Sequence, residues 1–99
     1  MKLHLDDNDL GTCVSCGLCL PHCPTFRVSG EEALSPRGRI SAMRSVHFDD
    51  AEVSTDFVHF METCVQCRGC EPACPSGVPF GQLMEGTRDT LAAQKRMTP

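Results

Sequence analysis

The sequence predicts an all-α fold, and three observations support this prediction. Apolar residues recur at helical spacing in the long segment between residues 24 and 63, and again after residue 79. No stretch alternates strictly between apolar and polar residues for more than a few positions. Neither Asn-Gly nor Asp-Gly, the common dipeptides of tight β-hairpins, occurs in the chain. We therefore expect helices and loops to supply the framework.

A first helix is expected to begin at Ser35 and Pro36. Serine is a favoured N-cap because its hydroxyl accepts a hydrogen bond from the first turn, and proline suits the first helical position. Ile40, Met43 and Val46 then follow at helical spacing and form an apolar stripe.

Two further helices are expected on either side of the second cysteine-rich segment. One opens near Ser54 and runs directly into Cys64. Its apolar residues are Phe57, Val58 and Met61. The other opens at Pro79 and has one apolar face along its length. That face consists of Phe80, Leu83, Met84, Thr87 and Leu91.

Every cysteine in the chain belongs to one of two runs with the same spacing. Each run reads Cys-x-x-Cys-x-x-Cys-x-x-x-Cys-Pro, first over residues 13–24 and again over residues 64–75. Three thiolates at this short spacing can wrap one face of an inorganic core, because each intervening pair of residues makes a tight turn. The fourth cysteine, followed by proline, leaves that turn and is free to reach elsewhere.

This doubled spacing is typical of bacterial ferredoxins with two 4Fe-4S clusters, in which the fourth cysteine of each run ligates the other cluster. We therefore expect two 4Fe-4S clusters with crossed ligands. One cluster is assigned to Cys13, Cys16, Cys19 and Cys74. The other is assigned to Cys64, Cys67, Cys70 and Cys23. The chemistry that follows from such clusters is one-electron transfer.

Two other uses of cysteine compete with this interpretation. A structural zinc domain also uses Cys-x-x-Cys pairs, but it needs two pairs for each metal and has no use for a third cysteine at the same spacing. A disulfide scaffold belongs to secreted chains. Asp6 and Asp7 lie where a signal peptide would have its apolar stretch, so a reducing, cytoplasmic location is expected.

The length of the chain limits its domain organisation and its core. The 99 residues are expected to form a single domain, with a helical connector at residues 25–63, as part of a longer protein or complex. Such a short chain buries a modest core, so bound clusters are expected to stabilise it.

The net charge of −4 argues against nucleic acid as a partner. No apolar run is long enough to span a membrane, so any membrane association is expected to come through partners.

The chain also resembles the N-terminal domain of the glycolate oxidase iron–sulfur subunit. The likeness covers residues 10–90 and includes both cysteine runs. Its more particular parts are Ser-Pro-Arg-Gly-Arg-Ile at residues 35–40 and Cys-Pro-Ser-Gly-Val at residues 74–78. The cysteine runs alone are shared with iron–sulfur subunits of anaerobic glycerol-3-phosphate dehydrogenase and heterodisulfide reductase.

The resemblance implies an α-helical ferredoxin domain that receives electrons from a flavoprotein subunit, which oxidises a 2-hydroxy acid such as glycolate or lactate. A quinone-linked acceptor is expected to receive the electrons. The chain itself has no Gly-rich phosphate loop and no acid–base constellation outside the cysteine runs. We therefore expect a non-catalytic electron-transfer component of an oxidoreductase, with no catalytic residue.

Residues beyond the cysteines are candidates for a supporting role. Gly17 and Gly69 lie inside the runs, where a glycine either lets backbone N–H groups approach a cluster or simply makes a turn. Four arginines are candidates to balance cluster charge or to pair with an acidic partner, although a solvated surface is the more common place for arginine. They are Arg37, Arg39, Arg44 and Arg68.

Overall fold

In the computed structural model, which describes residues 3–14 and 16–94, the protein is helical. The helices are α1 (Asp7–Gly11), α2 (Pro24–Ser29), α3 (Pro36–His47), α4 (Thr55–Glu62) and α5 (Phe80–Ala93). Two 3₁₀ turns, η1 (Leu20–His22) and η2 (Glu32–Leu34), complete the regular structure. No strand occurs within the described ranges, so the prediction of an all-α fold is confirmed.

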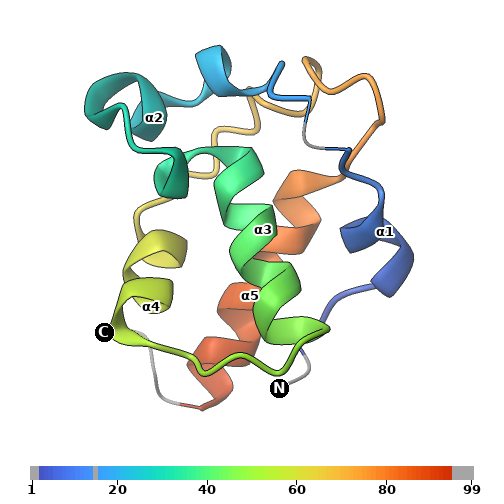
Figure 1. The fold of residues 1–99 in the computed structure, drawn as a ribbon, viewed down its shortest axis with the longest axis vertical. Helices are drawn as coiled ribbons and strands as arrows, with labels where there is room; N and C mark the ends of the chain where they lie inside the picture. The colour runs from blue at the N-terminus through green and yellow to red at the C-terminus, as the bar shows by residue number, and fades with distance from the viewer. Residues whose placement is uncertain (1–2, 15, 95–99) are drawn as a thin grey trace.

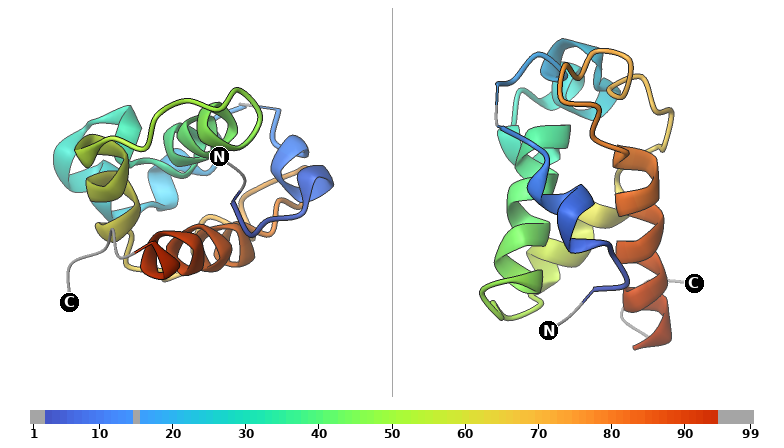
Figure 2. Two further views of the ribbon diagram at one scale, coloured as in Figure 1. Left: turned by 90° about the horizontal axis from the view of Figure 1, so that it is seen from below. Right: turned by 90° about the vertical axis from the view of Figure 1, so that its right-hand side faces the viewer.

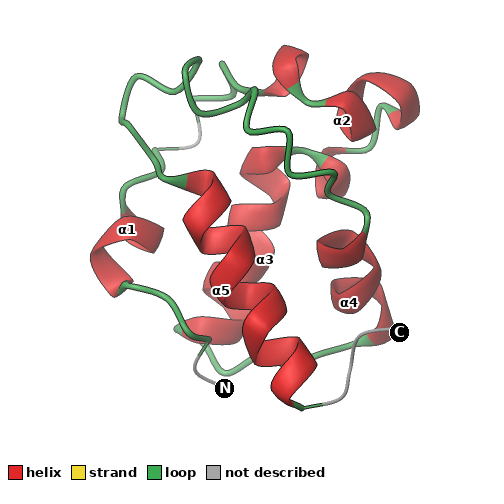
Figure 3. Ribbon diagram, turned by 180° about the vertical axis from the view of Figure 1, so that it is seen from behind, coloured by secondary structure: helices red, strands yellow, loops and turns green. Residues whose placement is uncertain are grey.

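The molecule has a helical end and a loop end (Figure 1). Helices α1, α3, α4 and α5 make up the helical end, whereas the two cysteine runs and α2 lie together at the other (Figure 2). Coloured by secondary structure, the chain around the runs is mostly loop (Figure 3). Both α3 and α5 begin next to these loops and run away from them.

Helix α3 forms for the reasons that its sequence suggests. The Ser35 hydroxyl accepts a hydrogen bond from the Gly38 N–H at 3.0 Å, and Pro36 occupies the first helical position. Ile40, Met43 and Val46 are buried along one face. The predicted start and apolar stripe are both confirmed.

The other two predicted helices are also present. Ser54 caps α4 by accepting a hydrogen bond from the Phe57 N–H at 3.1 Å, and α4 buries Phe57 and Met61. Helix α5 follows Pro79 directly. Every residue of its predicted apolar face is buried: Phe80, Leu83, Met84, Thr87 and Leu91.

The short helices α1 and α2 were not predicted, because neither is long enough to show a helical period. Asp6 caps α1 by accepting hydrogen bonds from the N–H groups of Asn8 and Asp9. Pro24, directly after Cys23, is the first residue of α2, and Gly30 ends that helix at φ 71°. Proline therefore starts a helix where the first run ends.

One hydrophobic core joins the helices. Its fully buried members come from α1, α3, α4 and α5 and include Leu10, Met43, Met61, Met84 and Leu91. Cys70 belongs to this core, and several other cysteines pack against its edge. The cysteine-bearing loops are therefore continuous with the core rather than attached to its surface.

Gly38 allows the closest approach between α3 and the segment before it. A Cβ atom at this position would overlap the backbone carbonyl of Glu32. We expect Gly38→Ala to destabilise the protein by about 2 kcal/mol, because two backbone segments must separate. For a domain of this size, that corresponds to a fall in Tm of roughly 10 °C.

The matched control is Gly11→Ala at the end of α1, where an added Cβ meets nothing within 4 Å. Its Tm is expected to stay close to that of the unsubstituted protein, because alanine also restricts the unfolded chain. Thermal melting of both variants by circular dichroism, under anaerobic conditions, checks this expectation. Equal Tm values for the two variants would show that the α3 contact is not tight.

Candidate metal centre

All eight cysteines have free thiols and lie on the two loops at one end of the molecule. Cys23 and Cys70 are buried, Cys16 and Cys67 are exposed, and the remaining four are half-buried. The structure therefore brings the two runs together, although residues 24–63 separate them in sequence.

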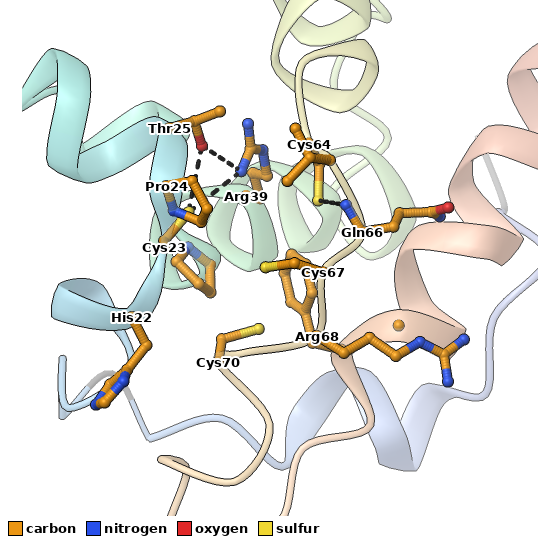
Figure 4. Close-up of a pocket in the computed structure, with 14 residues that line it drawn as sticks. His22, Cys23, Pro24, Thr25, Arg39, Cys64, Gln66, Cys67, Arg68 and Cys70 are labelled. Atoms are coloured by element: carbon orange, nitrogen blue, oxygen red, sulfur yellow. Dashed lines mark hydrogen bonds between the residues drawn. The ribbon is translucent and has the colours of Figure 1, made fainter.

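One cavity is lined by thiols from both runs. Cys23, from the first run, lines the same cavity as Cys64, Cys67 and Cys70 from the second. Figure 4 shows the sulfurs of Cys67 and Cys70 turned toward the space that lies between the runs. This is the set in which the fourth cysteine of the first run joins the triplet of the second.

A second cavity contains thiols of the other combination. Cys19 and Cys74 line it, and Cys70 borders it as well. Cys13 and Cys74 are close enough to Cys19 to affect its pKa. Cys16, the remaining member of the expected set, lies exposed on its loop.

Burial and neighbouring thiols raise the pKa values of two of the cysteines. Burial raises the pKa of the Cys70 thiol to about 12, and the neighbouring Cys19 and Cys64 thiols add to that shift. Burial also raises the pKa of Cys19, although a hydrogen bond from the Arg37 backbone N–H opposes the shift. Metal binding must deprotonate these thiols, so assembly of the site releases protons.

The two cavities adjoin each other. Pro36, at the start of α3, and Phe80, at the start of α5, line both of them, as does Cys70. Helix N-termini carry partial positive charge and free N–H groups, which favour an anionic group beside them. Both long helices therefore begin at the thiols.

The donor set fits an iron–sulfur group. Thiolates are the ligands that such clusters take from proteins, and N–H groups directed at sulfur tune their potential. Besides the Arg37 N–H at Cys19, the Gln66 N–H donates to the Cys64 sulfur at 3.4 Å. Among the described residues, no three metal-ligating side chains converge closely enough to hold a single ion; the cysteines instead surround the two cavities.

Left-handed backbone shapes both cysteine loops. Gly17 has φ 80°, and Gln66 and Arg68 have φ 55° and 59°. Gly17 and Arg68 hold the same place in their runs, between the second and third cysteines. The sequence singled out Gly17 and Gly69 together, but Gly69 has a different role. A Cβ there would lie 3.2 Å from the His22 carbonyl, so Gly69 permits close approach of the first run.

Two arginines hold the first cysteine of each run in corresponding ways. Arg44 of α3 donates to the carbonyl of Leu10 at 3.1 Å and to that of Cys13 at 2.6 Å. Arg88 of α5 donates to the carbonyl of Met61 at 3.0 Å and to that of Cys64. Met61 and Cys64 hold the same places in the second run as Leu10 and Cys13 in the first. The arginines thus complete the C-terminal ends of α1 and α4.

Sequence reasoning did not single out Arg88. Its position in α5 gives no local sign that it reaches across to the carbonyls at the end of α4. The available signal was that the carbonyl acceptors lie at corresponding positions of the two runs. That correspondence can be recognised only once the arginine donors on α3 and α5 are known. For Arg44, the expected alternatives were cluster charge, an acidic partner or solvent, and the structure shows carbonyl acceptors instead.

The other three candidate arginines differ in their surroundings. Arg37 pairs with Glu32, and Arg68 pairs with Glu85 at 2.7 Å, in both cases at the surface. Arg39, in contrast, is completely buried, so a solvated surface is wrong for this residue. Figure 4 shows it beside Cys23 and Thr25 at the cavity.

Comparison with known proteins assigns this arrangement to a family. The family described as "4Fe-4S dicluster domain" matches residues 9–78, which include both cysteine runs. A search for a membrane span finds no helix of the described chain long and apolar enough to cross a bilayer.

Curated relatives match almost the whole chain. The "Probable glycolate oxidase iron-sulfur subunit" of Bacillus subtilis is 45% identical over 96% of this chain, and the "Glycolate oxidase iron-sulfur subunit" of Escherichia coli is 39% identical over 94%. One subunit of a Methanosarcina barkeri heterodisulfide reductase is 30% identical over 84%. The chain spans only 22% of the length of the first two relatives and 24% of the third.

Proposed function

Because the chain belongs to the 4Fe-4S dicluster domain family, we propose that it carries electrons through two 4Fe-4S clusters. Residues 1–99 act as one unit in this proposal. Cys13, Cys16, Cys19 and Cys74 hold one cluster. Cys23, Cys64, Cys67 and Cys70 hold the other.

The observation that carries the proposal is the mixed cavity. Cys23 lines one cavity with the triplet of the second run, and Cys74 lines the other with Cys19 of the first run and Cys70 of its own. A pair of independent single-run sites would instead place each fourth cysteine with its own triplet. The mixed sets agree with the ligand exchange of two-cluster ferredoxins.

The chain's own residues bind the clusters and set their surroundings. When bound, the clusters supply one-electron oxidation and reduction. The thiolates ligate iron, and the N–H groups of Arg37 and Gln66 stabilise negative charge on the sulfurs of Cys19 and Cys64. Pro36 and Phe80 border both cavities, which keeps the two sites adjacent to each other.

We further propose that the domain works within a 2-hydroxy-acid-oxidising complex in the cytoplasm. The names of the two glycolate oxidase relatives support this context. In the proposed sequence, a flavoprotein subunit oxidises glycolate or lactate and passes single electrons to the clusters, which pass them toward a quinone-linked acceptor. A heterodisulfide-reductase-type complex is the alternative context, and its relatives are less similar to this chain.

A relay assay tests the proposed function. Anaerobically purified protein with visible cluster absorption should be bleached by photoreduced free flavin and should recover its colour when a water-soluble quinone is added. Cluster-free protein is the control. The chain alone should not reduce a dye with glycolate or lactate as substrate, because it has no acid–base site among its motifs. Glycolate oxidation by the flavin-free chain, or clusters that flavin cannot reduce, would contradict the proposal.

A further inference from the structure

Arg39 is a fully buried cation in contact with Cys23, one of the proposed cluster ligands. None of its surface is exposed to solvent. Its Nε donates to the Phe60 carbonyl at 2.8 Å, and its two terminal nitrogens donate to the hydroxyls of Thr25 at 3.1 Å and Thr63 at 3.0 Å. The nitrogen that bonds Thr25 also lies 3.8 Å from the Cys23 sulfur.

No carboxylate of the described residues pairs with this guanidinium, whose partners are a carbonyl, two hydroxyls and a sulfur. An arginine cannot escape its charge by losing a proton. Burial of an uncompensated charge is strongly unfavourable, so an anionic group is expected within reach. The Cys23 sulfur is the group in contact with Arg39 that becomes anionic when it ligates metal.

The contacts of Cys23 also change when it is ligated. Without metal, its S–H donates to the Leu34 carbonyl at 3.4 Å. A ligated sulfur has no proton and can only accept. The donors then within reach are Arg39 and the Thr25 hydroxyl, which lies 3.2 Å from the sulfur. The Thr25 hydroxyl donates its proton to the Leu34 carbonyl instead. Arg39 is therefore the donor that remains for the Cys23 sulfur.

We infer that Arg39 raises the reduction potential of the cluster held by Cys23, Cys64, Cys67 and Cys70 above that of the other cluster. This inference rests on the proposed function and its two crossed ligand sets. Reduction adds negative charge to a cluster, and a nearby buried cation stabilises the more negative form. An electron that enters the domain therefore rests preferentially on the cluster beside Arg39.

The other arginines near the two sites do not favour either one. Arg44 and Arg88 bond the carbonyls of Cys13 and Cys64, so each site has one of them. Arg37 lies near Gly17 in the first run but pairs with Glu32 at the surface. Arg68 lies in the second run but pairs with Glu85 at the surface. Surface pairs of this kind are screened by solvent and are nearly neutral at a distance. Arg39 is buried and has no carboxylate partner among the described residues, so it distinguishes the sites.

Redox titration followed by electron paramagnetic resonance tests the inference. Arg39→Met removes the charge while keeping an apolar stem, and Arg39→Lys keeps the charge. Arg27→Gln removes an exposed arginine of α2 that lines neither cavity. The titration should show two reduction steps, one for each cluster. In Arg39→Met, the step at the higher potential should move to a more negative potential. The lower step should stay in place, and both steps should be unchanged in Arg27→Gln. In Arg39→Lys, the higher step should stay closer to its original potential.

Arg39→Met protein that keeps both clusters and both potentials would overturn the inference, and so would equal shifts of both steps. A second measurement does not depend on that variant folding. Serine in place of a ligating cysteine shifts the potential of its own cluster. The higher step should therefore respond to Cys67→Ser and the lower step to Cys16→Ser, both at exposed positions.

The opposite order of response would overturn the inference but leave the proposed function intact. Failure of the proposed function has a different signature, because the unsubstituted protein would then lack bound iron and inorganic sulfide. Metal and sulfide content of every preparation is therefore measured alongside the potentials.

Discussion

Removal of iron from the reduced protein is expected to abolish most of its cooperative thermal melting and to lower its helical circular dichroism. The loops that carry the cysteines have little regular structure apart from η1, so few backbone hydrogen bonds of their own stabilise them. Because ligands must be gathered from both runs, the free energy of metal binding becomes folding free energy.

Three arginines make the helical end sensitive to the loss of iron. Arg39 remains buried without an anion, which costs several kcal/mol for an uncompensated charge. Arg44 and Arg88 bond carbonyls of Cys13 and Cys64, so disorder in the loops also frees the ends of α1 and α4. Unfolding of the loops is therefore expected to spread into the core.

The measurement is a circular dichroism melt before and after chelation under reducing, anaerobic conditions. Protein that has been reloaded with iron and sulfide is the control, and it should regain the transition. An iron-free protein with full helicity and a sharp transition would show that helix packing suffices without metal.

Much of the helical framework could be predicted from local sequence. Ser35 followed by Pro36 is a helix start whose physics is contained in two adjacent residues, and the predicted stripe behind it is buried. The α5 face was equally readable because it extends over several turns. Helices α1 and α2 were not, since they are too short for a period and depend on Asp6 and Pro24 as caps.

The environment of the arginines was beyond the reach of sequence reasoning. Arg37 and Arg39 are neighbours in the same helical turn, yet one pairs with a surface carboxylate and the other is buried beside Cys23. That difference depends on which face of α3 meets Thr25, Phe60 and the second run, and such contacts are formed only in the folded chain. The cysteine spacing, in contrast, depends on the chemistry of the ligands and is visible in sequence.

Cys23→Ala and Cys74→Ala are expected to damage opposite clusters. Cys23 lies with Cys64, Cys67 and Cys70, so its loss should remove the cluster of the second run. Cys74 lies with Cys19, so its loss should remove the cluster of the first run. Each variant should keep about half of the iron and inorganic sulfide of the unsubstituted protein, which should hold about eight of each.

Each variant is the matched control of the other, because both remove the last cysteine of a run that is followed by proline. A second substitution identifies the surviving cluster. Cys16→Ser should alter the remaining spectrum in Cys23→Ala protein but not in Cys74→Ala protein. Cys67→Ser should have the reverse pattern, since Cys67 lines the cavity that contains Cys23.

Electron paramagnetic resonance of the reduced, anaerobically prepared variants is the most direct test of crossed ligation. We predict that the Cys23→Ala protein retains only the signal that Cys16→Ser perturbs, and that the Cys74→Ala protein retains only the signal that Cys67→Ser perturbs. Retention of the opposite signal in each variant, or preparations that contain zinc and no inorganic sulfide, would contradict the account.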